Sequence, residues 1–307
     1  MRSFFMALSA SKAMGRLFAR FPPARRVARR FIAGESLEDA LAVATTLNAE
    51  GKEATLNYLG EKVTCPEDAR QVVTAYEKIM QQMHGSGLKA TISVKPTHLG
   101  LGLDEALFEA NLGALLGTAD PLGIDVEVDM EDSGTTGETL RIIHALLLKH
   151  KRLRVALQAS LHRTAEDLMA LAELGGSARL VKGAYDEPET VAWKSKREVD
   201  QSYSRLIGAS LSRQALDAGF YPAFGTHDHR LIEEIISAAA DQGIGKDRFE
   251  FQMLLGIRRD WQDKLKNQGF KVRIYVPFGS QWYPYFMRRL AERPANVLFM
   301  IRALFSR

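Results

Sequence analysis

The sequence has only one cysteine, Cys65, among its 307 residues. A single thiol excludes a disulfide within the chain and any metal centre built from several cysteines, which fits a reducing compartment such as the cytoplasm. No run reaches the roughly 18 consecutive apolar residues that a membrane-spanning helix requires. The excess of positive charge is also small, since the sequence has 41 basic and 37 acidic residues. We therefore expect no nucleic-acid partner.

Acidic residues are missing from positions 1–33, which combine Phe, Leu and Met with eight Arg and Lys. Lys12 and Arg16 interrupt the apolar part, which disfavours a secretory signal. The composition is typical of an amphipathic helix that caps a domain, and also of a helix that lies on an anionic membrane surface. The second hypothesis would place a cytoplasmic protein at the inner face of the cell membrane.

From residue 54 onward, short β-prone runs alternate with longer segments in which apolar residues recur at helical spacing. Eight alternations predict a (β/α)8 barrel, with a doubly wound open sheet as the competing fold. Residues 1–53 would form an N-terminal helical arm, and residues 54–307 the barrel. The expected strands are 54–60, 90–95, 124–130, 154–159, 178–184, 222–227, 248–253 and 272–278, and the expected helices include 66–83, 103–117, 137–150, 165–174, 202–219 and 229–242.

Nearly every expected strand ends in a polar or charged residue. In a parallel barrel these ends lie on one face, where barrel enzymes build their active sites. Polar residues often end strands simply because loops follow. A lysine, two acids, an arginine and a histidine at the ends of neighbouring strands are more charged residues than loops alone would supply. The residues are Glu61, Lys95, Asp129, Glu131, Gln158, Arg179, Lys182, Thr226, His227, Gln252 and Tyr275.

The expected strand IDVEVDM places Asp125, Glu127 and Asp129 on one face, because side chains alternate along a strand. Unpaired buried charges are very costly, so the three carboxylates need cations nearby. The expected partners on neighbouring strands are Lys95, Arg154 and Arg179.

The run THDH at 226–229 supports an alternative function. Barrel metallohydrolases gather histidines and acids at strand ends, so His227, Asp228 and His229 would hold a metal ion for hydrolysis. The other histidines lie in expected helices or loops, which disfavours this alternative. We expect no metal, and we expect His227 to hydrogen-bond a ligand.

Near the C-terminus, the segment WYPYFMRRLAERP predicts a helix from near Pro284 to just before Pro294. Adjacent helical residues point about 100° apart, so Arg288 and Arg289 would approach a small anion from two sides. Paired guanidiniums suit a carboxylate, although a solvated surface pair is the commoner arrangement. Glu292 lies one turn further and would pair with them.

Taken together, these stretches resemble the proline dehydrogenase family. The resemblance runs from about residue 30 to the C-terminus in one register, and RLVKGAY combined with YFMRRL is its most specific part. The length resembles that of the stand-alone bacterial enzyme, without an aldehyde dehydrogenase half. The stretches are YLGE (58–61), SVK (93–95), DMEDS (129–133), LQAS (157–160), RLVKGAY (179–185), THD (226–228), FEFQMLLG (249–256), RIYVPFG (273–279) and WYPYFMRRLAERP (282–294).

The resemblance implies a distorted TIM-type barrel that holds FAD at the C-terminal ends of its strands, with the last helix over the barrel mouth. It also implies oxidation of L-proline to Δ1-pyrroline-5-carboxylate, by hydride transfer from C5 to flavin N5, with the electrons passed to a membrane quinone. A flavin- or proline-binding regulator without turnover is a further hypothesis. Neither the residues nor the resemblance fixes the oligomeric state, and a homo-oligomer stays open.

The family pattern also implies roles for single residues. Lys95, Asp129 and Arg179 match core catalytic positions, with Arg179 expected near flavin N5. Glu61 would pair with Arg288 as a gate that closes the pocket. The flavin-contacting positions match Met130, Gln158, Arg179, Val181, Lys182, Gly183, Ala184, Thr226 and His227, and the substrate pocket matches Lys95, Leu254, Tyr275, Tyr285, Arg288 and Arg289.

Two further expectations concern specificity and loop geometry. Tyr285 would pack against the proline ring and leave little room for a 4-hydroxyl, so we expect proline to be favoured over hydroxyproline. Pro96 departs from the family pattern, in which leucine often follows the active-site lysine. The local geometry of the loop after Lys95 therefore stays open, whereas Lys95 itself matches the pattern.

Overall fold

Eight parallel strands close into a barrel in the order β1 to β8 in the computed structural model, which describes residues 28–292 and the side chains of residues 28–289. The predicted barrel is confirmed, and the open doubly wound sheet is excluded. Each strand neighbours the next one in sequence, and β8 pairs with β1. The strands are β1 (Glu53–Tyr58), β2 (Ala90–Val94), β3 (Val126–Val128), β4 (Leu153–Gln158), β5 (Ser177–Val181), β6 (Tyr221–Gly225), β7 (Glu250–Leu254) and β8 (Lys271–Phe278).

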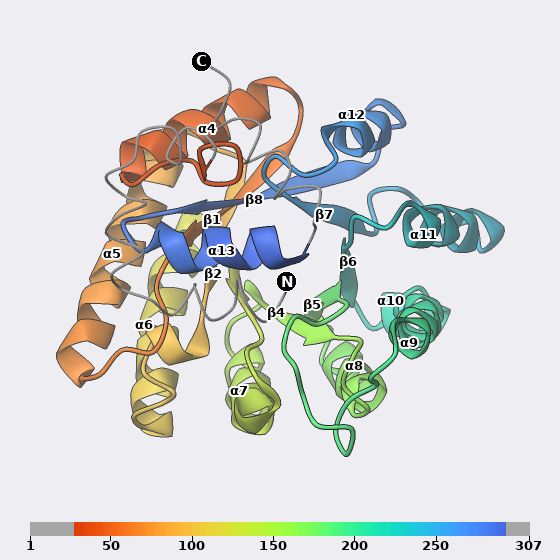
Figure 1. Ribbon diagram of the computed structural model, residues 1–307, viewed down its shortest axis with the longest axis horizontal. Coiled ribbons are helices and arrows are strands. Elements are labelled where there is room, and N and C mark those ends of the chain that lie inside the picture. The colour runs from red at the N-terminus through yellow and green to blue at the C-terminus, as the bar shows by residue number, and fades with distance from the viewer. Residues whose placement is uncertain (1–27, 293–307) are drawn as a thin grey trace.

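Most helices form a ring outside the barrel, and Figure 1 shows them arranged around the strands. The expected helix over 202–219 is wrong in one respect, because it consists of two helices. The first ends at Ser210, and Ser212 caps the second, where its hydroxyl accepts the Ala215 N–H. The helices are α4 (Leu37–Ala49), α5 (Pro66–Gly85), α6 (Glu105–Leu122), α7 (Ser133–Leu147), α8 (Thr164–Glu173), α9 (Lys196–Ser210), α10 (Arg213–Asp217), α11 (His229–Asp241), α12 (Arg259–Asn267) and α13 (Trp282–Glu292), with a short 3-10 helix, η1 (Pro96–His98).

The apolar core lies between the strands and the surrounding helices. Leu56, Ile92, Val128, Leu180 and Ile274 are fully buried on the outer face of the barrel wall. Alternation then directs the intervening residues of each strand toward the barrel axis, and many of these are charged or polar. The barrel interior is consequently a polar compartment that opens at the C-terminal ends of the strands.

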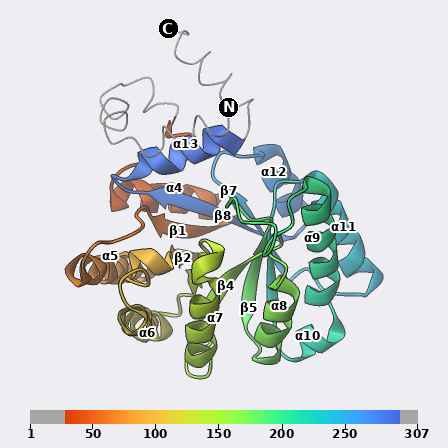
Figure 2. The same ribbon diagram turned by 60° about the horizontal axis from the view of Figure 1, so that its bottom comes forward.

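The last helix, α13, lies across this opening and outside the outer ring of helices, as Figures 1 and 2 show from two directions. Phe286 is fully buried beneath it and packs with Phe31, Leu59 and Ile257 in a second apolar cluster. Trp282 adds a hydrogen bond from its indole nitrogen to Glu35 at 3.2 Å. The helix expected near Pro284 is therefore present and begins two residues earlier, over the mouth.

The described part of the N-terminal segment packs on the barrel. Helix α4 contacts β1 and β8, with Ala40 and Ala44 fully buried. Just before it, the Ala33 N–H donates to Pro277 O at 2.9 Å. Residues 1–27, which include most of the basic segment, lie outside the described residues, so the division into an arm and a barrel at residue 53 stays a prediction.

Within residues 28–292, no helix combines the length and the apolar character that crossing a membrane requires.

Candidate active site

An ion pair between Arg179 and Asp129 occupies the centre of the barrel mouth. Arg179 lies in β5, Asp129 directly follows β3, and their exposed fractions are only 7% and 8%. One guanidinium nitrogen of Arg179 donates to Asp129 Oδ1, and the other donates to Glu127 Oε2 at 2.9 Å. The structure therefore brings together the partners expected from the IDVEVDM strand.

Two hydroxyl groups complete the shell around Asp129. Tyr275 in β8 donates to Oδ2 at 2.7 Å, and Ser93 in β2 donates to Oδ1 at 2.7 Å. Burial alone would raise the pKa of Asp129, but Arg179, Lys95 and these donors outweigh it and lower the pKa. Asp129 is thus held as an anion, and the guanidinium of Arg179 lies 5.4 Å from the Tyr275 ring centroid.

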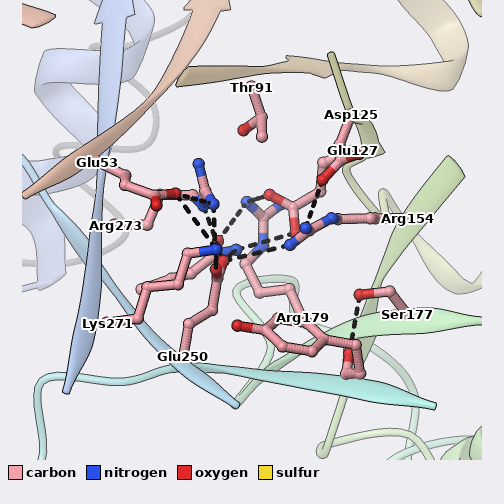
Figure 3. A network of polar contacts seen from close by, with 12 residues as sticks. Glu53, Thr91, Asp125, Glu127, Arg154, Ser177, Arg179, Glu250, Lys271 and Arg273 are labelled. Carbon is pink, nitrogen blue, oxygen red and sulfur yellow. Dashed lines mark hydrogen bonds and ion pairs between the residues drawn. The ribbon is translucent and has the colours of Figure 1, made fainter. Parts of the chain in front are cut away.

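Beneath this pair, a network of buried charges continues down the barrel axis (Figure 3). Glu250 is completely buried, and Arg273 binds it through Nε at 2.8 Å. The Gln252 amide connects the levels, because it donates to Glu127 and Glu250 and accepts from Arg179. The floor of the site is consequently rigid and polar, and Arg179 is held from below as well as by Asp129.

Arg154 and Lys95, the other two expected partners, occupy different levels. Arg154 binds Asp125 and lies 3.4 Å from Glu250, near the bottom of the network. Lys95 follows β2 at the mouth, where its charge lowers the pKa of Asp129 and of Glu61. Lys95 thus lies at the level where a ligand would enter, whereas Arg154 serves the barrel floor.

The expected gate pair is present in geometry. Arg288 on α13 binds Glu61, three residues after β1, at 2.8 Å, and both side chains are 28% exposed. Burial would raise the pKa of Glu61, but Arg288 and Lys95 outweigh it and lower the pKa. Whether this pair opens and closes stays a prediction.

The other residues expected in the substrate pocket include Tyr285 and Arg289 on α13 and Leu254 at the end of β7. The Arg289 guanidinium stacks 5.1 Å from the centroid of Tyr285, one turn earlier on α13. Tyr285 is buried and close enough to Tyr275 to influence its ionisation. Leu254, at the end of β7, packs against the apolar cluster beneath α13. The pairing expected for Glu292 involves a side chain outside the described residues.

The expected flavin positions gather at the ends of β3 to β6. Gln158 ends β4, is 3% exposed, and donates to Glu131 O at 2.8 Å, next to buried Met130. Val181 ends β5, followed by Lys182, whose ammonium binds Asp200 at 2.6 Å and Asp228 at 2.9 Å. The side chain of Lys182 is therefore held by α9 and the start of α11, and its contact with a flavin stays a prediction.

Gly183 shows why glycine is needed after Lys182. Its φ of 105° is a left-handed conformation, and a Cβ there would lie 2.1 Å from Ser160 Oγ. The chain can therefore turn sharply at the end of β5 and leave Ala184 exposed beside the mouth.

The metal-dependent hydrolase alternative is not supported. His227 Nε2 accepts the Leu254 N–H at 2.9 Å, while Asp228 caps α11 and binds Lys182 and Arg230. His229 is already the first residue of α11. Among residues 28–289, no group of three or more His, Cys, Asp or Glu side chains is arranged to hold a metal ion. Thr226, buried after β6, instead accepts the Asp228 N–H and fixes this turn.

Comparison with known proteins agrees with this geometry. The family model described as proline dehydrogenase matches residues 40–302. The chain is also 38% identical over 307 residues to proline dehydrogenase 1 of Bacillus subtilis subsp. natto, with 100% of both chains covered. The chain belongs to the proline dehydrogenase family. It is also 38% identical over 283 residues to proline dehydrogenase of Deinococcus radiodurans, covering 91% of this chain and 90% of the relative.

Solved structures show the same barrel in larger family proteins. Proline utilization A from Bdellovibrio bacteriovorus, inactivated by N-propargylglycine, superposes with a TM-score of 0.81 at 24% identity. The match covers 87% of this chain and 32% of that one, so the chain spans about a third of its length. At this identity the likeness concerns the fold. The family, in turn, identifies the chain as a proline dehydrogenase and supports oxidation of proline.

For a proline dehydrogenase site, the structure adds residues that were not expected from the sequence. Ser93 supports Asp129, and the alternation of Thr91, Ser93 and Lys95 on one face of β2 was the available signal. Tyr185, the last residue of RLVKGAY, lies near Glu131 and Glu61, and burial followed by these charges raises the pKa of its hydroxyl. Both residues extend the polar lining of the mouth.

His98 predicts an acid-dependent loss of stability. Its ring is 5% exposed, and its Nδ1 has no hydrogen-bond partner within the described residues. Burial and then Lys95 lower the pKa of His98 from 6.5 to about 4. The unfolded chain therefore takes up a proton at a higher pH than the folded one, so this contribution to stability is complete above pH 6.5 and is lost as the pH falls toward 4.

His98→Gln removes this titration. As the pH falls from neutral to about 4, the free energy of unfolding of the variant should therefore decrease by about 2 to 3 kcal/mol less than that of the wild type. Urea unfolding at a series of pH values measures the difference. His84→Gln, at an exposed position, is the matched control and should leave the profile unchanged. Parallel profiles for wild type and His98→Gln would contradict the prediction.

Proposed function

We propose that the chain binds FAD at the C-terminal ends of β3 to β6 and oxidises L-proline to Δ1-pyrroline-5-carboxylate. The observation that carries this proposal is the buried Arg179–Asp129–Tyr275 cluster, which lies beneath a helix bearing two adjacent arginines. Family membership supports proline as the substrate, and the cluster supplies a charged floor next to the place where the ring would lie. Electrons leave, in this proposal, to a membrane quinone.

The donors at the strand ends fit a flavin. A flavin ring presents carbonyl oxygens and nitrogens along one edge, and it needs amide, hydroxyl and cationic groups opposite them. Gln158, Thr226 and His227 provide an amide, a hydroxyl and an imidazole, and the glycine turn at Gly183 lets the backbone approach closely. Arg179 adds a buried cation, which would stabilise the negative charge that the flavin ring system gains on accepting a hydride.

Proline would be held by its charged group from one side and by its ring from the other. Arg288 and Arg289 would bind the carboxylate with charge-assisted hydrogen bonds. Tyr275, Tyr285 and Leu254 would enclose the ring, and Tyr285 would leave little space for a 4-hydroxyl. Fixing C5 in one place lowers the entropic part of the barrier, and the Glu61–Arg288 pair would keep water out.

When bound, FAD would supply the hydride acceptor for C5 of proline and the route by which two electrons reach the quinone. Loss of that hydride, together with one proton from the ring nitrogen, leaves the C=N bond of Δ1-pyrroline-5-carboxylate. The residues of the chain orient the ring, neutralise its carboxylate and shield the reacting atoms. Arg179, Lys95 and the hydroxyl donors lower the pKa of Asp129, so its carboxylate would hold Arg179 in place as an anion.

The enzyme would work in the cytoplasm at the inner face of the cell membrane. The basic composition of residues 1–33 supports this location, since such segments attract anionic lipid surfaces. A homo-oligomer stays open.

The flavin spectrum tests the proposed function. Protein purified with added FAD should be yellow, and L-proline under anaerobic conditions should bleach the oxidised flavin absorbance. A soluble quinone should then restore the absorbance, and trans-4-hydroxyproline should act much more weakly. Protein that binds FAD but keeps its oxidised spectrum with L-proline would contradict the proposal, and so would protein that binds no FAD.

A further inference from the structure

The gate loop, residues 59–65 between β1 and α5, carries Glu61 toward α13. At its start, the Leu59 N–H donates to Phe278 O at 2.8 Å. Beyond Glu61, the Lys62 N–H donates to Thr97 Oγ1 at 3.1 Å, and the Val63 N–H donates to Thr97 O at 3.3 Å. The loop is therefore attached, directly after Glu61, to η1.

Thr97 is itself held by a buried carboxylate. Glu131, which is 2% exposed, accepts the Thr97 N–H at 2.7 Å and the Thr97 hydroxyl at 2.8 Å. The hydroxyl thus donates its single proton to Glu131 and accepts the Lys62 N–H with a lone pair. A serine or threonine hydroxyl can perform both tasks at this position, whereas valine, which has a shape similar to that of threonine, can perform neither.

The other side of Glu61 is fixed by packing. Gly60 is buried against the His98 ring, and a Cβ on Gly60 would lie 2.2 Å from His98 Nε2. Lys62 has a φ of 55°, a left-handed conformation that an unsupported lysine rarely adopts. Both flanks of Glu61 therefore rest on η1, one through a ring contact and the other through Thr97.

Glu131, which holds Thr97, also lies next to the positions proposed for the cofactor. Gln158 donates to the backbone oxygen of Glu131 at 2.8 Å, and Met130 directly precedes Glu131. The backbone oxygen of Glu131 thus contacts the end of β4. Its carboxylate binds Thr97, which in turn binds the gate loop.

We propose that Thr97, held by Glu131, is a positioning residue that keeps the gate loop in the conformation in which Glu61 reaches Arg288. The inference rests on the proposed function, in which the Glu61–Arg288 pair closes over bound proline. In this proposal Thr97 contacts neither proline nor the flavin. It acts through the backbone of Lys62. Its contribution should therefore disappear when Glu61 is removed.

The test compares Thr97→Val, which keeps the shape but loses the hydroxyl, with Thr97→Ser, which restores it. Amide hydrogen exchange of residues 59–65 should accelerate about tenfold or more in the valine variant and stay close to wild type in the serine variant. The KM for proline should rise about 5- to 20-fold in the valine variant, with kcat changed by less than about threefold. The serine variant should lie within about twofold of wild type in both constants.

The double variant Glu61→Ala/Thr97→Val separates positioning from general damage. With Glu61 absent, the second substitution should raise KM by less than about twofold further. An equal rise in both backgrounds would overturn the proposal, and so would unchanged exchange in Thr97→Val. Wild-type protein with the expected exchange pattern but no proline oxidation would contradict the proposed function, and the exchange data would still decide whether Thr97 anchors the loop.

Discussion

Replacing Arg289 with methionine is expected to raise the KM for proline about 100-fold, because a charge-assisted hydrogen bond to the carboxylate contributes about 1.5–3 kcal/mol. Arg288→Met should act in the same direction. The fall in kcat should be smaller, since neither side chain is expected to contact the reacting C5. Methionine preserves much of the apolar stem that packs beneath α13, so steady-state kinetics should report the lost charge.

A substrate without a carboxylate provides the control for this clamp. Pyrrolidine should be a poor substrate of the wild type, and the arginine variants should handle it no worse than the wild type does. Arg213→Met, at an exposed position on α10, is the matched variant and should leave the KM for proline unchanged. Unchanged KM values in both Arg288→Met and Arg289→Met would refute the carboxylate clamp.

The two variants should also differ from each other. Arg288 binds Glu61, so its loss removes the gate partner as well as a carboxylate ligand. Arg289 instead stacks on the ring of Tyr285. Proline release should therefore accelerate more in Arg288→Met than in Arg289→Met, which rapid-mixing measurements can resolve.

The barrel was predictable because local pattern and global fold agree along most of the chain. Period-two alternation in β3 placed three acids on the inner face, and the charges on β4 and β5 identified Arg154 and Arg179 as their partners. The ends of elements were less predictable. Strand β3 covers only Val126–Val128, so Asp125 and Asp129 lie just outside the strand expected over 124–130.

The gate pair shows the limit of pattern alone. Glu61 and Arg288 are separated by most of the barrel sequence, and the resemblance to a known family, not spacing, suggested that they meet. Lys182 shows the converse. It directly follows β5 with a parity opposite to that of Arg179 and Val181, and its ammonium binds Asp200 and Asp228, while its expected contact with the flavin stays a prediction.

Other contacts depend on loop paths that the sequence does not encode locally. Thr97 receives the gate loop only because η1 turns directly after Lys95, where Pro96 begins the short helix. The pairing of Glu131 with Thr97 joins segments 34 residues apart. Such contacts follow from how the closed barrel brings neighbouring strand ends together, so they become visible only once β2 and β3 are placed side by side.

Arg179→Met is expected to be the most damaging single change in the barrel. The guanidinium binds Glu127, Asp129 and Gln252 from a site that is 7% exposed. Removing one partner of a buried ion pair costs about 3–5 kcal/mol, because the remaining charge is left uncompensated. Two carboxylates are affected here, and one of them should take up a proton at neutral pH.

Arg179→Lys separates charge from geometry in this prediction. A lysine keeps the positive charge but cannot fork between Asp129 and Glu127, so it should recover part of the stability and little of the activity. Urea unfolding of the apoprotein measures the first effect, and the reduction potential of the flavin in the loaded protein measures the second. In Arg179→Met the potential should become more negative, because a cation next to N5 favours the reduced form. Unfolding free energy within about 1 kcal/mol of wild type, together with an unchanged potential, would show that Arg179 neither balances these carboxylates nor lies at the flavin.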